Sequence, residues 1–513
     1  MLAKLRSMAV LGIDAFEIGI ESDLTEMLPS FTIVGLPDGA VRESKERVMS
    51  AIKNCGFDFP IRKVTINMAP ADMKKEGSAF DLPIAIGLLI TSSQVSITTA
   101  DQYLIIGELS LDGSVKRVKG ALSMAIRARE LGIKGIILPR ENAMEASVAE
   151  GVKIYPVDNL TDAIDFLEEK KDIVPFVSDL SALFNQSRQY TIDFKDVKGQ
   201  EHIKRAILVA AAGGHNIMMI GPPGSGKTML ARRIPTILPD LSLDEALETT
   251  KIHSVSGLLD INTPLLATRP FRSPHHTISD AGLIGGGSYP RPGEVSLSHH
   301  GVLFLDELPE FSKNVLENLR QPLEDGKVTI SRALMSLSYP ARFMLAVALN
   351  PCPCGYYTDT RHRCTCKPDQ IQKYMSRISG PLLDRIDIHI EVPALSYEEL
   401  AQKQPGRDST SMREQVVKAR AAQMKRFIND KKVFCNAHME TRHIRKYCEL
   451  DEESQNLLRN AIEKLGLSAR AYDRILKVAR TIADLECSDS ILPMHIAEAI
   501  QYRSLDRKLW LGG

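Results

Sequence analysis

Residues 216–228 read Asn-Ile-Met-Met-Ile-Gly-Pro-Pro-Gly-Ser-Gly-Lys-Thr, in which an apolar run leads directly into a glycine-rich loop. The next segment, Met229–Leu238, has the apolar content of a packed helix. Glycines let backbone amides turn inward around phosphates, while Lys227 offers a charge to the β- and γ-phosphates and Thr228 a hydroxyl to Mg²⁺. The order strand, loop, helix therefore predicts a Walker A site for ATP. Its predicted residues are Gly221, Pro222, Pro223, Gly224, Ser225, Gly226, Lys227 and Thr228.

A second apolar run, Gly301–Leu305, ends in the carboxylates Asp306 and Glu307. Such a strand is buried, and its carboxylates emerge at the carboxyl end, beside the Walker A loop. We expect Asp306 to hold Mg²⁺ through water and Glu307 to polarise the attacking water. An apolar run that ends in Asp-Glu is common, so this Walker B prediction depends on its place downstream of the Walker A motif.

Two further polar residues resemble parts of the AAA+ ATPases. Asn350 follows the apolar run Met344–Leu349 and corresponds to sensor 1, the residue that orients the attacking water. Arg385 follows a short turn and resembles the arginine finger, which stabilises transition-state charge on the nucleotide of a neighbouring subunit. The alternative is that Arg385 forms a surface ion pair with Asp384 or Asp387.

The order of the motifs resembles one branch of the AAA+ class. Phe271–Ser279 lies between the two Walker motifs, and a long segment precedes Asn350. This arrangement is similar to the magnesium-chelatase subunit I branch and, within it, to the YifB/ComM-type competence proteins, over essentially the whole chain. The resemblance implies a homohexameric ring that performs ATP-driven helicase and branch-migration work on DNA in natural transformation. Arg470, which opens a C-terminal helix, resembles sensor 2, although Arg474 could take that place.

The resemblance and the pattern of the chain predict an α/β protein of several domains. They are a Lon-protease-like domain at 1–172, a linker at 173–192, an AAA+ core with a parallel sheet at 193–395 and a helical lid at 396–513. The lid helices are expected at Glu398–Lys403, Met412–Ile428, Glu452–Lys464 and Tyr472–Asp484.

Basic residues follow the Walker B motif at positions where DNA could be contacted. An amphipathic helix is predicted at Lys313–Glu324, followed by a ribbon of two strands, Lys327–Arg332 and Met335–Leu337, with a turn at Ala333-Leu334. The ribbon resembles the hairpin that precedes sensor 1 in this branch and projects into the central channel. Lys327 and Arg332 would then contact backbone phosphates, which suits a motor because such contacts are independent of sequence. Arg291, in the glycine-rich segment 285–291, resembles part of a second pore loop. The alternative is that both segments are ordinary solvated loops.

Half of the eight cysteines lie within fifteen residues. The two Cys-x-Cys pairs are Cys352, Cys354, Cys364 and Cys366. Four thiolates suit tetrahedral zinc, so we predict a structural Zn²⁺ in an insertion at 350–367; a reactive thiol cluster is the alternative. Since four cysteines leave no open position, catalytic zinc is not expected. His275, His276, His299 and His300 show no ligand spacing and are not predicted to hold a metal.

The first segment contains motifs that resemble the Lon peptidase domain, among them Gly107–Gly113 and Gly135–Asn142. In that domain a lysine activates a serine nucleophile. Here the nucleophile position falls on Ala79 and the lysine position on Leu122. Ser78 and Lys119 are displaced, and a shift of one residue in a strand turns a side chain to the other face. We therefore predict no peptidase activity and a role in assembly or substrate engagement.

Composition bears on whether the protein can bind DNA or a membrane. Lys and Arg together number 64, as do Asp and Glu, so a DNA partner requires a local basic lining. The most apolar stretch, Leu82–Ile90, is about half the length that spans a bilayer. Scattered cysteines and the lack of an export signal predict a cytoplasmic protein without membrane contact.

We expect a DNA-translocating ring that uses ATP, Mg²⁺ and structural zinc. The first alternative is a chelatase-like or protein-remodelling ATPase that does not move along DNA. The second, disfavoured by the missing serine and lysine, is a Lon-like ATP-dependent protease.

Overall fold

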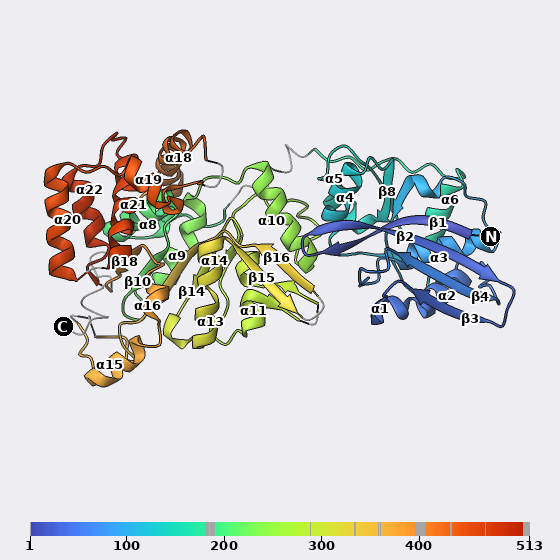
Figure 1. Ribbon diagram of the computed structural model, residues 1–513, viewed down its shortest axis with the longest axis horizontal. Coiled ribbons are helices and arrows are strands. Elements are labelled where there is room, and N and C mark those ends of the chain that lie inside the picture. The colour runs from blue at the N-terminus through green and yellow to red at the C-terminus, as the bar shows by residue number, and fades with distance from the viewer. Residues whose placement is uncertain are drawn as a thin grey trace. The chain divides into compact units, whose positions relative to one another are not determined.

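The computed structural model describes residues 2–179, 184, 190–287, 289–332, 335–357, 359, 361–394, 406–430, 433–466 and 468–505. The chain forms two compact units (Figure 1). The first contains Met1–Ser187 and Leu243–Ala267, and the second contains Arg188–Ser242 and Thr268–Gly513. Residues 243–267 therefore pack with the N-terminal unit, although they lie between the Walker motifs in sequence.

The first unit is built on a mixed seven-stranded sheet of order β3-β4-β2-β1-β5-β8-β9. Its strands are β1 Leu2–Leu11, β2 Asp14–Thr25, β3 Ser30–Val34, β4 Lys63–Ala69, β5 Tyr103–Ile105, β8 Gly135–Pro139 and β9 Lys153–Val157. Strands β1 and β2 form a long antiparallel hairpin, and Gly12 supplies the left-handed backbone of its turn, with φ of 68°. A small ribbon, β6 Glu108–Leu109 and β7 Val115–Lys116, lies apart from this sheet.

The helices of the first unit pack against this sheet or against one another. They are α1 Gly39–Arg42, α2 Ser44–Asn54, η1 Ala100–Gln102, α3 Asp81–Thr91, α4 Ala121–Glu130, α5 Arg140–Ser147, α6 Leu160–Leu167 and α10 Leu243–Ser256. Every residue of α3 is buried, so the most apolar stretch of the chain is a core helix. At Gly87 an added Cβ would lie 2.9 Å from Leu5 Cδ1, which shows how closely α3 approaches β1. Among the helices in the described part of the chain, none is long and apolar enough to cross a membrane.

The second unit contains a five-stranded parallel sheet of order β11-β14-β17-β10-β18. Its strands are β10 Ile217–Ile220, β11 Phe271–Arg272, β14 Val302–Leu305, β17 Met344–Leu349 and β18 Ile388–Glu391. The three central strands are buried along their whole length, as expected for parallel strands covered on both faces. Neighbouring helices are η2 Phe194–Asp196, α8 Glu201–Gly213 and α9 Lys227–Ile237. The predicted α/β fold class with a parallel sheet is confirmed.

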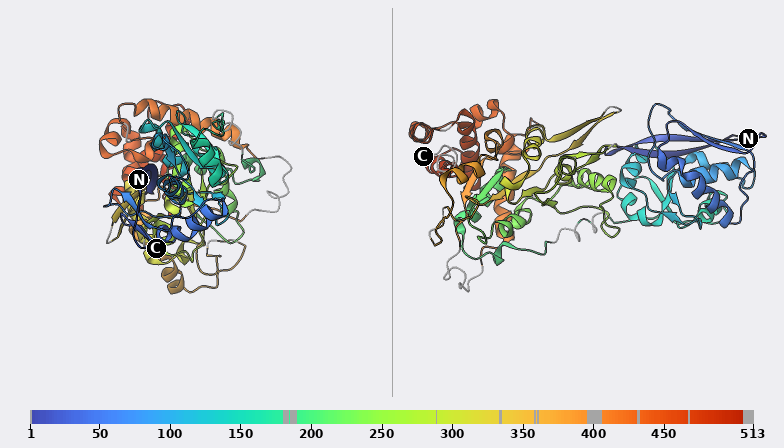
Figure 2. Two further views of the ribbon diagram at one scale, coloured as in Figure 1. Left: turned by 90° about the vertical axis from the view of Figure 1, so that its right-hand side faces the viewer. Right: turned by 90° about the horizontal axis from the view of Figure 1, so that it is seen from below.

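Short elements occupy the connections between β11 and β18. They are α11 Asp280–Ile284, β12 Gly285–Gly286, β13 Arg291–Pro292, α12 Glu294–Leu297, η3 Leu308–Glu310, α13 Lys313–Asn318, α14 Arg320–Asp325, β15 Lys327–Arg332, β16 Met335–Pro340, α15 Pro368–Met375 and α16 Gly380–Leu383. The predicted single helix Lys313–Glu324 is wrong, because the chain forms two helices, α13 and α14. Pro322 has no N–H to donate to Asn318, and its ring opposes a continuous helix there. The predicted ribbon is confirmed, because β15 and β16 pair antiparallel and extend from the body of the unit (Figure 2). The predicted turn at Ala333-Leu334 lies outside the described residues.

The C-terminal region of the second unit is helical. Its helices are α18 Ser409–Arg426, η4 Asn436–His438, α19 Thr441–Tyr447, α20 Glu452–Leu465, α21 Ala469–Leu485 and α22 Pro493–Gln501. The predicted helix Glu398–Lys403, and residues 180–183 and 185–189 of the predicted linker, lie outside the described residues.

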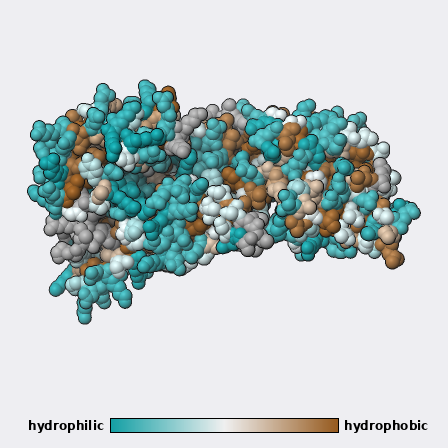
Figure 3. Space-filling view, viewed as in Figure 1, coloured by the Kyte–Doolittle hydropathy of each residue, from teal (hydrophilic) through white to brown (hydrophobic). Residues whose placement is uncertain are grey.

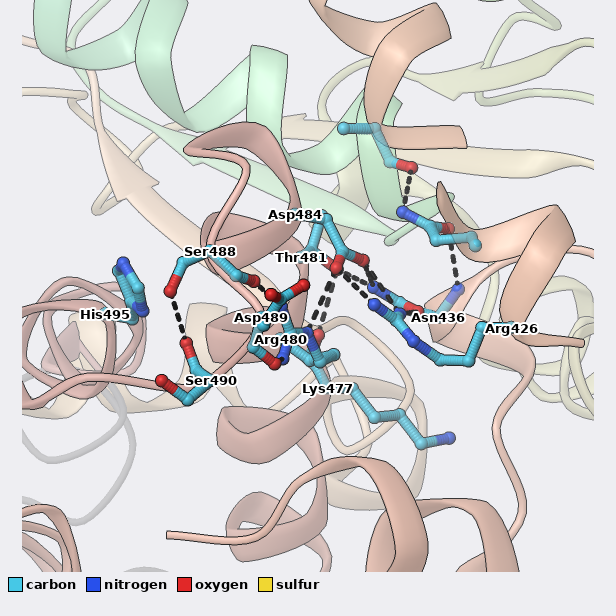
Figure 4. A network of polar contacts seen from close by, with 12 residues as sticks. Arg426, Asn436, Lys477, Arg480, Thr481, Asp484, Ser488, Asp489, Ser490 and His495 are labelled. Atoms are coloured by element: carbon cyan, nitrogen blue, oxygen red, sulfur yellow. Dashed lines mark hydrogen bonds and ion pairs between the residues drawn. The ribbon is translucent and has the colours of Figure 1, made fainter. Parts of the chain in front are cut away.

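Buried ion pairs hold the C-terminal helices together around Asp484 (Figure 4). Its carboxylate accepts hydrogen bonds from Arg426 Nη1 at 2.9 Å, Arg480 Nε at 3.0 Å and Asn436 Nδ2 at 2.8 Å. Arg480 also donates to the carbonyl of Asp489 at 2.8 Å. Two guanidinium groups on one buried carboxylate satisfy its lone pairs, so this polar cluster fixes the positions of α18, η4 and α21.

Candidate nucleotide site and neighbouring motifs

The glycine-rich loop connects β10 to α9, as the sequence predicts. Gly224 and Gly226 have φ of 75° and 91°, a left-handed backbone that turns successive amides toward one point. At Gly221 a Cβ would lie 2.1 Å from the carbonyl oxygen of Val392, just beyond β18. No side chain fits there, so the first glycine lets the loop sit close against the end of the neighbouring strand.

Lys227 lies at the start of α9 with its side chain buried in the loop. Its Nζ donates to the carbonyls of Gly221 at 2.8 Å and Pro222 at 2.9 Å, and lies 3.3 Å from Asn350 Oδ1. Burial lowers the pKa of Lys227 to about 8, against the opposing effect of the Asp306 carboxylate. The Lys227 ammonium thus connects the glycine-rich loop to the end of β17. A phosphate group bound in this loop would accept hydrogen bonds from the ammonium.

Thr228 and Asp306 meet at the end of β14. Thr228 Oγ1 donates to Asp306 Oδ2 at 2.6 Å, and the other Asp306 oxygen accepts from the Glu307 amide at 3.0 Å. A hydroxyl and a carboxylate in contact are the oxygen donors that Mg²⁺ prefers, so these two residues fit that ion.

Glu307 has a left-handed backbone with φ of 53°, an uncommon conformation outside glycine. Its side chain is 55% exposed, and Oε2 lies 3.4 Å from His276 Nδ1. The sequence did not indicate that His276 lies beside Glu307. It drew attention to His276 only as one of four histidines that were not predicted to hold a metal. The pair places a titratable group next to the carboxylate predicted to polarise water.

Gln200 is a second residue that the sequence did not single out. It adopts φ of 55° at the start of α8, and its buried side chain donates from Nε2 to the carbonyl of Ser225 at 3.0 Å. The amide therefore supports the glycine-rich loop from behind. A single glutamine near the edge of a predicted domain carries no signal that could have identified it.

Arg385 is buried between α16 and β18. Its Nη1 donates to the carbonyl of Pro381 at 2.5 Å, and its Nη2 pairs with Glu324 on α14. Neither Asp384 nor Asp387, the partners proposed for a surface ion pair, holds it. Among the described residues its Nε has no hydrogen-bond partner.

Arg470 and Arg474 lie one turn apart on α21. Arg470 is 62% exposed and reaches Asp384 at 3.6 Å, whereas Arg474 is largely buried and pairs with Asp387. Asp387 Oδ2 also lies 3.0 Å from His215 Nδ1.

His215 completes a link between α21 and the sheet. Its Nε2 lies 2.8 Å from Thr481 Oγ1, and burial lowers its pKa to about 3. A neutral imidazole therefore connects Thr481 to Asp387, two residues after Arg385. The sequence did not predict this polar chain, because its members come from three distant segments.

The four cysteines come together as predicted. The sulfur of Cys352 lies 3.3 Å from that of Cys354 and 3.7 Å from that of Cys364, and Cys354 and Cys364 are 3.6 Å apart. All four sulfurs lie within 4.8 Å of one another. Zinc bound at about 2.3 Å by four thiolates requires sulfur separations of about 3.8 Å, so the cluster is compatible with Zn²⁺.

The cysteine loop packs against the nucleotide loop. Gly355 has φ of 87°, and a Cβ added there would lie 2.6 Å from Pro223 Cδ. The cluster therefore braces the glycine-rich loop from the side of β17.

The candidate DNA-contacting residues occupy two neighbouring ribbons. Lys327, Arg332 and Arg291 are all exposed. Arg332 Nε lies 3.4 Å from the Gly287 carbonyl, and Tyr339 donates its hydroxyl proton to the Pro290 carbonyl at 2.7 Å. These contacts join β15–β16 to the glycine-rich segment of β12 and β13.

The positions of the Lon nucleophile and lysine are apolar and buried in the first unit. Ala79 is 9% exposed and Leu122 is fully buried. The nearby Ser78 hydroxyl donates to Glu108, and the Leu122 amide donates to Glu145 at 3.1 Å. Both contacts are local, and neither of the two positions carries a serine or a lysine.

Strand order and site together define an ATPase of the AAA+ class, with polar residues at the carboxyl ends of β10, β14 and β17. Comparison with known proteins gives the family. Residues 193–400 match the family description "Magnesium chelatase, subunit ChlI", residues 20–142 match "Subunit ChlI of Mg-chelatase" and residues 406–503 match "Magnesium chelatase, subunit ChlI C-terminal". The chain belongs to the YifB/ComM branch of this magnesium-chelatase-like family.

Several relatives span nearly the whole chain. The YifB protein of Salmonella typhimurium is 44% identical over 510 residues, which cover 99% of this chain and 98% of that protein. The competence protein ComM of Haemophilus influenzae is 44% identical over 511 residues, with the same coverage. A shorter match is to Lon protease 2 of Bacillus subtilis, which is 34% identical over 157 residues that cover 28% of this chain and 27% of that protein.

Proposed function

We propose that the protein is a ring-forming motor that uses ATP to move along single-stranded or branched DNA, in helicase or branch-migration steps of natural transformation. The name of the Haemophilus relative, competence protein ComM, supports the biological setting. The nucleotide site and the exposed basic ribbons support the mechanism.

Residues of the glycine-rich loop bind the phosphates of ATP. Its amides surround the phosphate oxygens, and Lys227 leaves the carbonyls of Gly221 and Pro222 to contact the β- and γ-phosphates. Asn350, already next to the lysine ammonium, holds the attacking water in line. Glu307 polarises that water after moving away from His276.

Thr228 and Asp306 would hold Mg²⁺, which would supply positive charge to the phosphate oxygens of ATP. Arg470, which is exposed on the C-terminal helix α21, reaches the nucleotide as sensor 2. The tie between Arg474 and Asp387 keeps α21 attached to the sheet while Arg470 moves.

The contact between Arg385 and Glu324 is the observation that carries this proposal. Glu324 lies on α14, and three residues later the chain enters β15 at Lys327. In a ring, Arg385 would release Glu324 to approach the nucleotide of the neighbouring subunit. Because α14 leads directly into the ribbon, that exchange would move β15 and β16 with the nucleotide state of the neighbour.

Lys327, Arg332 and Arg291 then contact backbone phosphates in the central channel. Phosphate contacts are independent of base sequence, and each one releases counterions, so binding weakens as salt rises. The four cysteines would hold a structural Zn²⁺, which would keep the loop after Asn350 in place and leave no open position for catalysis.

The test is the steady-state rate of ATP hydrolysis with and without forked or three-stranded DNA, at low and at physiological salt. We expect strong stimulation by DNA that fades as salt rises, and a loss of stimulation in a Lys327→Ala, Arg332→Ala double variant. The matched control is Lys418→Ala, which removes an exposed charge from α18. A rate indifferent to DNA would reject translocation and favour an ATPase that remodels a protein partner.

A further inference from the structure

The segment from Cys352 to Arg377 forms a small lobe beside the nucleotide site. It contains the cysteine cluster and α15, which projects from the rest of the second unit (Figure 1). The projecting part is hydrophilic on the face shown in Figure 3. We name residues 352–377 the cysteine lobe.

The cysteine lobe is basic within a chain of zero net charge. It contains five Lys or Arg residues and two Asp residues, an excess of three positive charges over these side chains. Four thiolates on Zn²⁺ would carry a net charge of −2 at the base of the lobe, so the positive charge lies on the exposed side chains around the cluster. The basic residues are Arg361, Arg363, Lys367, Lys373 and Arg377. A local basic surface of this kind is what a neutral protein needs to bind a polyanion.

The Asp359 carboxylate is turned inward at the tip of the lobe. The side chain of Asp359 is only 5% exposed, accepts from the Arg361 amide at 2.8 Å and lies 3.0 Å from His362 Nδ1. Arg361, Arg363 and Lys367 are all exposed. The carboxylate thus shapes the turn from inside while the cationic side chains face solvent.

Aromatic rings accompany the positive charges. Tyr357 is 49% exposed, and Tyr356 packs on His362 with ring centroids 4.9 Å apart. Exposed aromatic rings between basic residues are the typical surface for single-stranded nucleic acids, because bases stack on the rings while cations follow the backbone. Duplex DNA offers no free base faces to Tyr357.

The base of the lobe is fixed to the nucleotide site. Arg377 donates to Glu310 at 2.9 Å and to the Pro309 carbonyl at 3.2 Å, both just after the Walker B carboxylates. Gly355 packs on Pro223 in the glycine-rich loop. A ligand on the tip is therefore connected through two short paths to the residues that bind ATP.

We propose that the cysteine lobe is a second DNA-contacting surface, separate from the β15–β16 ribbon, that binds single-stranded DNA through Arg361, Arg363, Lys367 and Tyr357. This inference rests on the proposed function. It adds a contact that binds strand already separated, while the ribbon acts in the channel.

The test measures binding of a fluorescent oligo(dT) to the full chain by anisotropy across a salt titration. A triple variant, Arg361→Ala, Arg363→Ala, Lys367→Ala, is compared with a control that loses three exposed C-terminal charges, Lys418→Ala, Arg445→Ala, Arg459→Ala. Zinc content is measured in each protein to show that the cluster is intact.

We expect the lobe variant to bind about tenfold more weakly, with the slope of log affinity against log salt reduced by about 2, since each phosphate contact on single strands contributes about 0.7. Tyr357→Ala should weaken binding with the slope unchanged, and basal ATP hydrolysis should stay the same in both variants. Unchanged affinity and slope in the lobe variant, when the parent protein binds oligo(dT), would overturn this inference alone. Failure of the parent protein to bind any DNA would overturn the proposed function and this inference together.

Discussion

The two sheets of this protein support very different chemistry. In the second unit, the carboxyl ends of β14 and β17 meet the start of α9, where Lys227 contacts Asn350 and Thr228 donates to Asp306. In the first unit, the positions where a Lon peptidase has its nucleophile and lysine are Ala79 and Leu122, both buried among apolar side chains. Strands and helices form because apolar residues are buried, whereas catalysis depends on a few side chains. A Lon-like architecture can therefore form with apolar residues at both of these positions.

Lys227→Ala tests the nucleotide site of the second unit and should have the largest effect on ATP binding and hydrolysis. Removing the ammonium should abolish ATP binding and lower hydrolysis by at least about 10³-fold, because the phosphate charge loses its main cationic partner. Nucleotide binding is measured with a fluorescent ATP analogue and hydrolysis by phosphate release. Turnover close to that of the parent protein would contradict the assignment of the site.

Arg385→Ala should separate hydrolysis from binding. If Arg385 is an arginine finger, we expect nucleotide affinity to be retained and hydrolysis to fall by about 10³-fold. The side chain of Glu324 is 56% exposed, so loss of its partner leaves no buried unpaired charge behind.

Mixing supplies the control for that variant. Glu307→Gln subunits keep Arg385 but cannot polarise water, so combining them with Arg385→Ala subunits should restore part of the activity if the arginine acts on a neighbour. No recovery at any mixing ratio would show that Arg385 acts within its own subunit or has a structural role.

Leu122→Lys tests the first unit, where the Lon lysine position is apolar, and should have the smallest effect on ATP hydrolysis. An ammonium at this fully buried position should lower the free energy of unfolding of the first unit by about 3 kcal/mol, while ATP hydrolysis changes little. Hydrogen exchange at α4, compared with α9, measures the local loss. Ala79→Ser is the matched control, with an expected change below about 1 kcal/mol. Peptidase activity in the double variant would show that the first unit still holds a substrate site.

Local motifs were readable from the sequence because they depend on neighbouring residues. The glycine-rich loop, the Walker B strand and the β15–β16 ribbon follow from short patterns of apolar, glycine and charged residues. The cysteine cluster was found because its ligands lie within fifteen residues.

Contacts between distant segments could not be read in the same way. The pairing of Arg385 with Glu324 and the support of the loop by Gln200 depend on how helices pack, which no local pattern encodes. The predicted helix Lys313–Glu324 was wrong for a different reason. The prediction followed the helical spacing of the apolar residues and ignored Pro322, which interrupts a helix.

Residues 243–267 belong to the first unit although the second unit flanks them in sequence, and this limits where the chain can be cut into two folded parts. Both ends of this segment continue into the second unit, so the chain passes between the units three times. Cutting after residue 172 would leave α10 attached to the ATPase with its buried side chains Ala246, Thr249 and Ile252 uncovered. A separately expressed ATPase unit would therefore need these residues replaced or covered in order to fold alone.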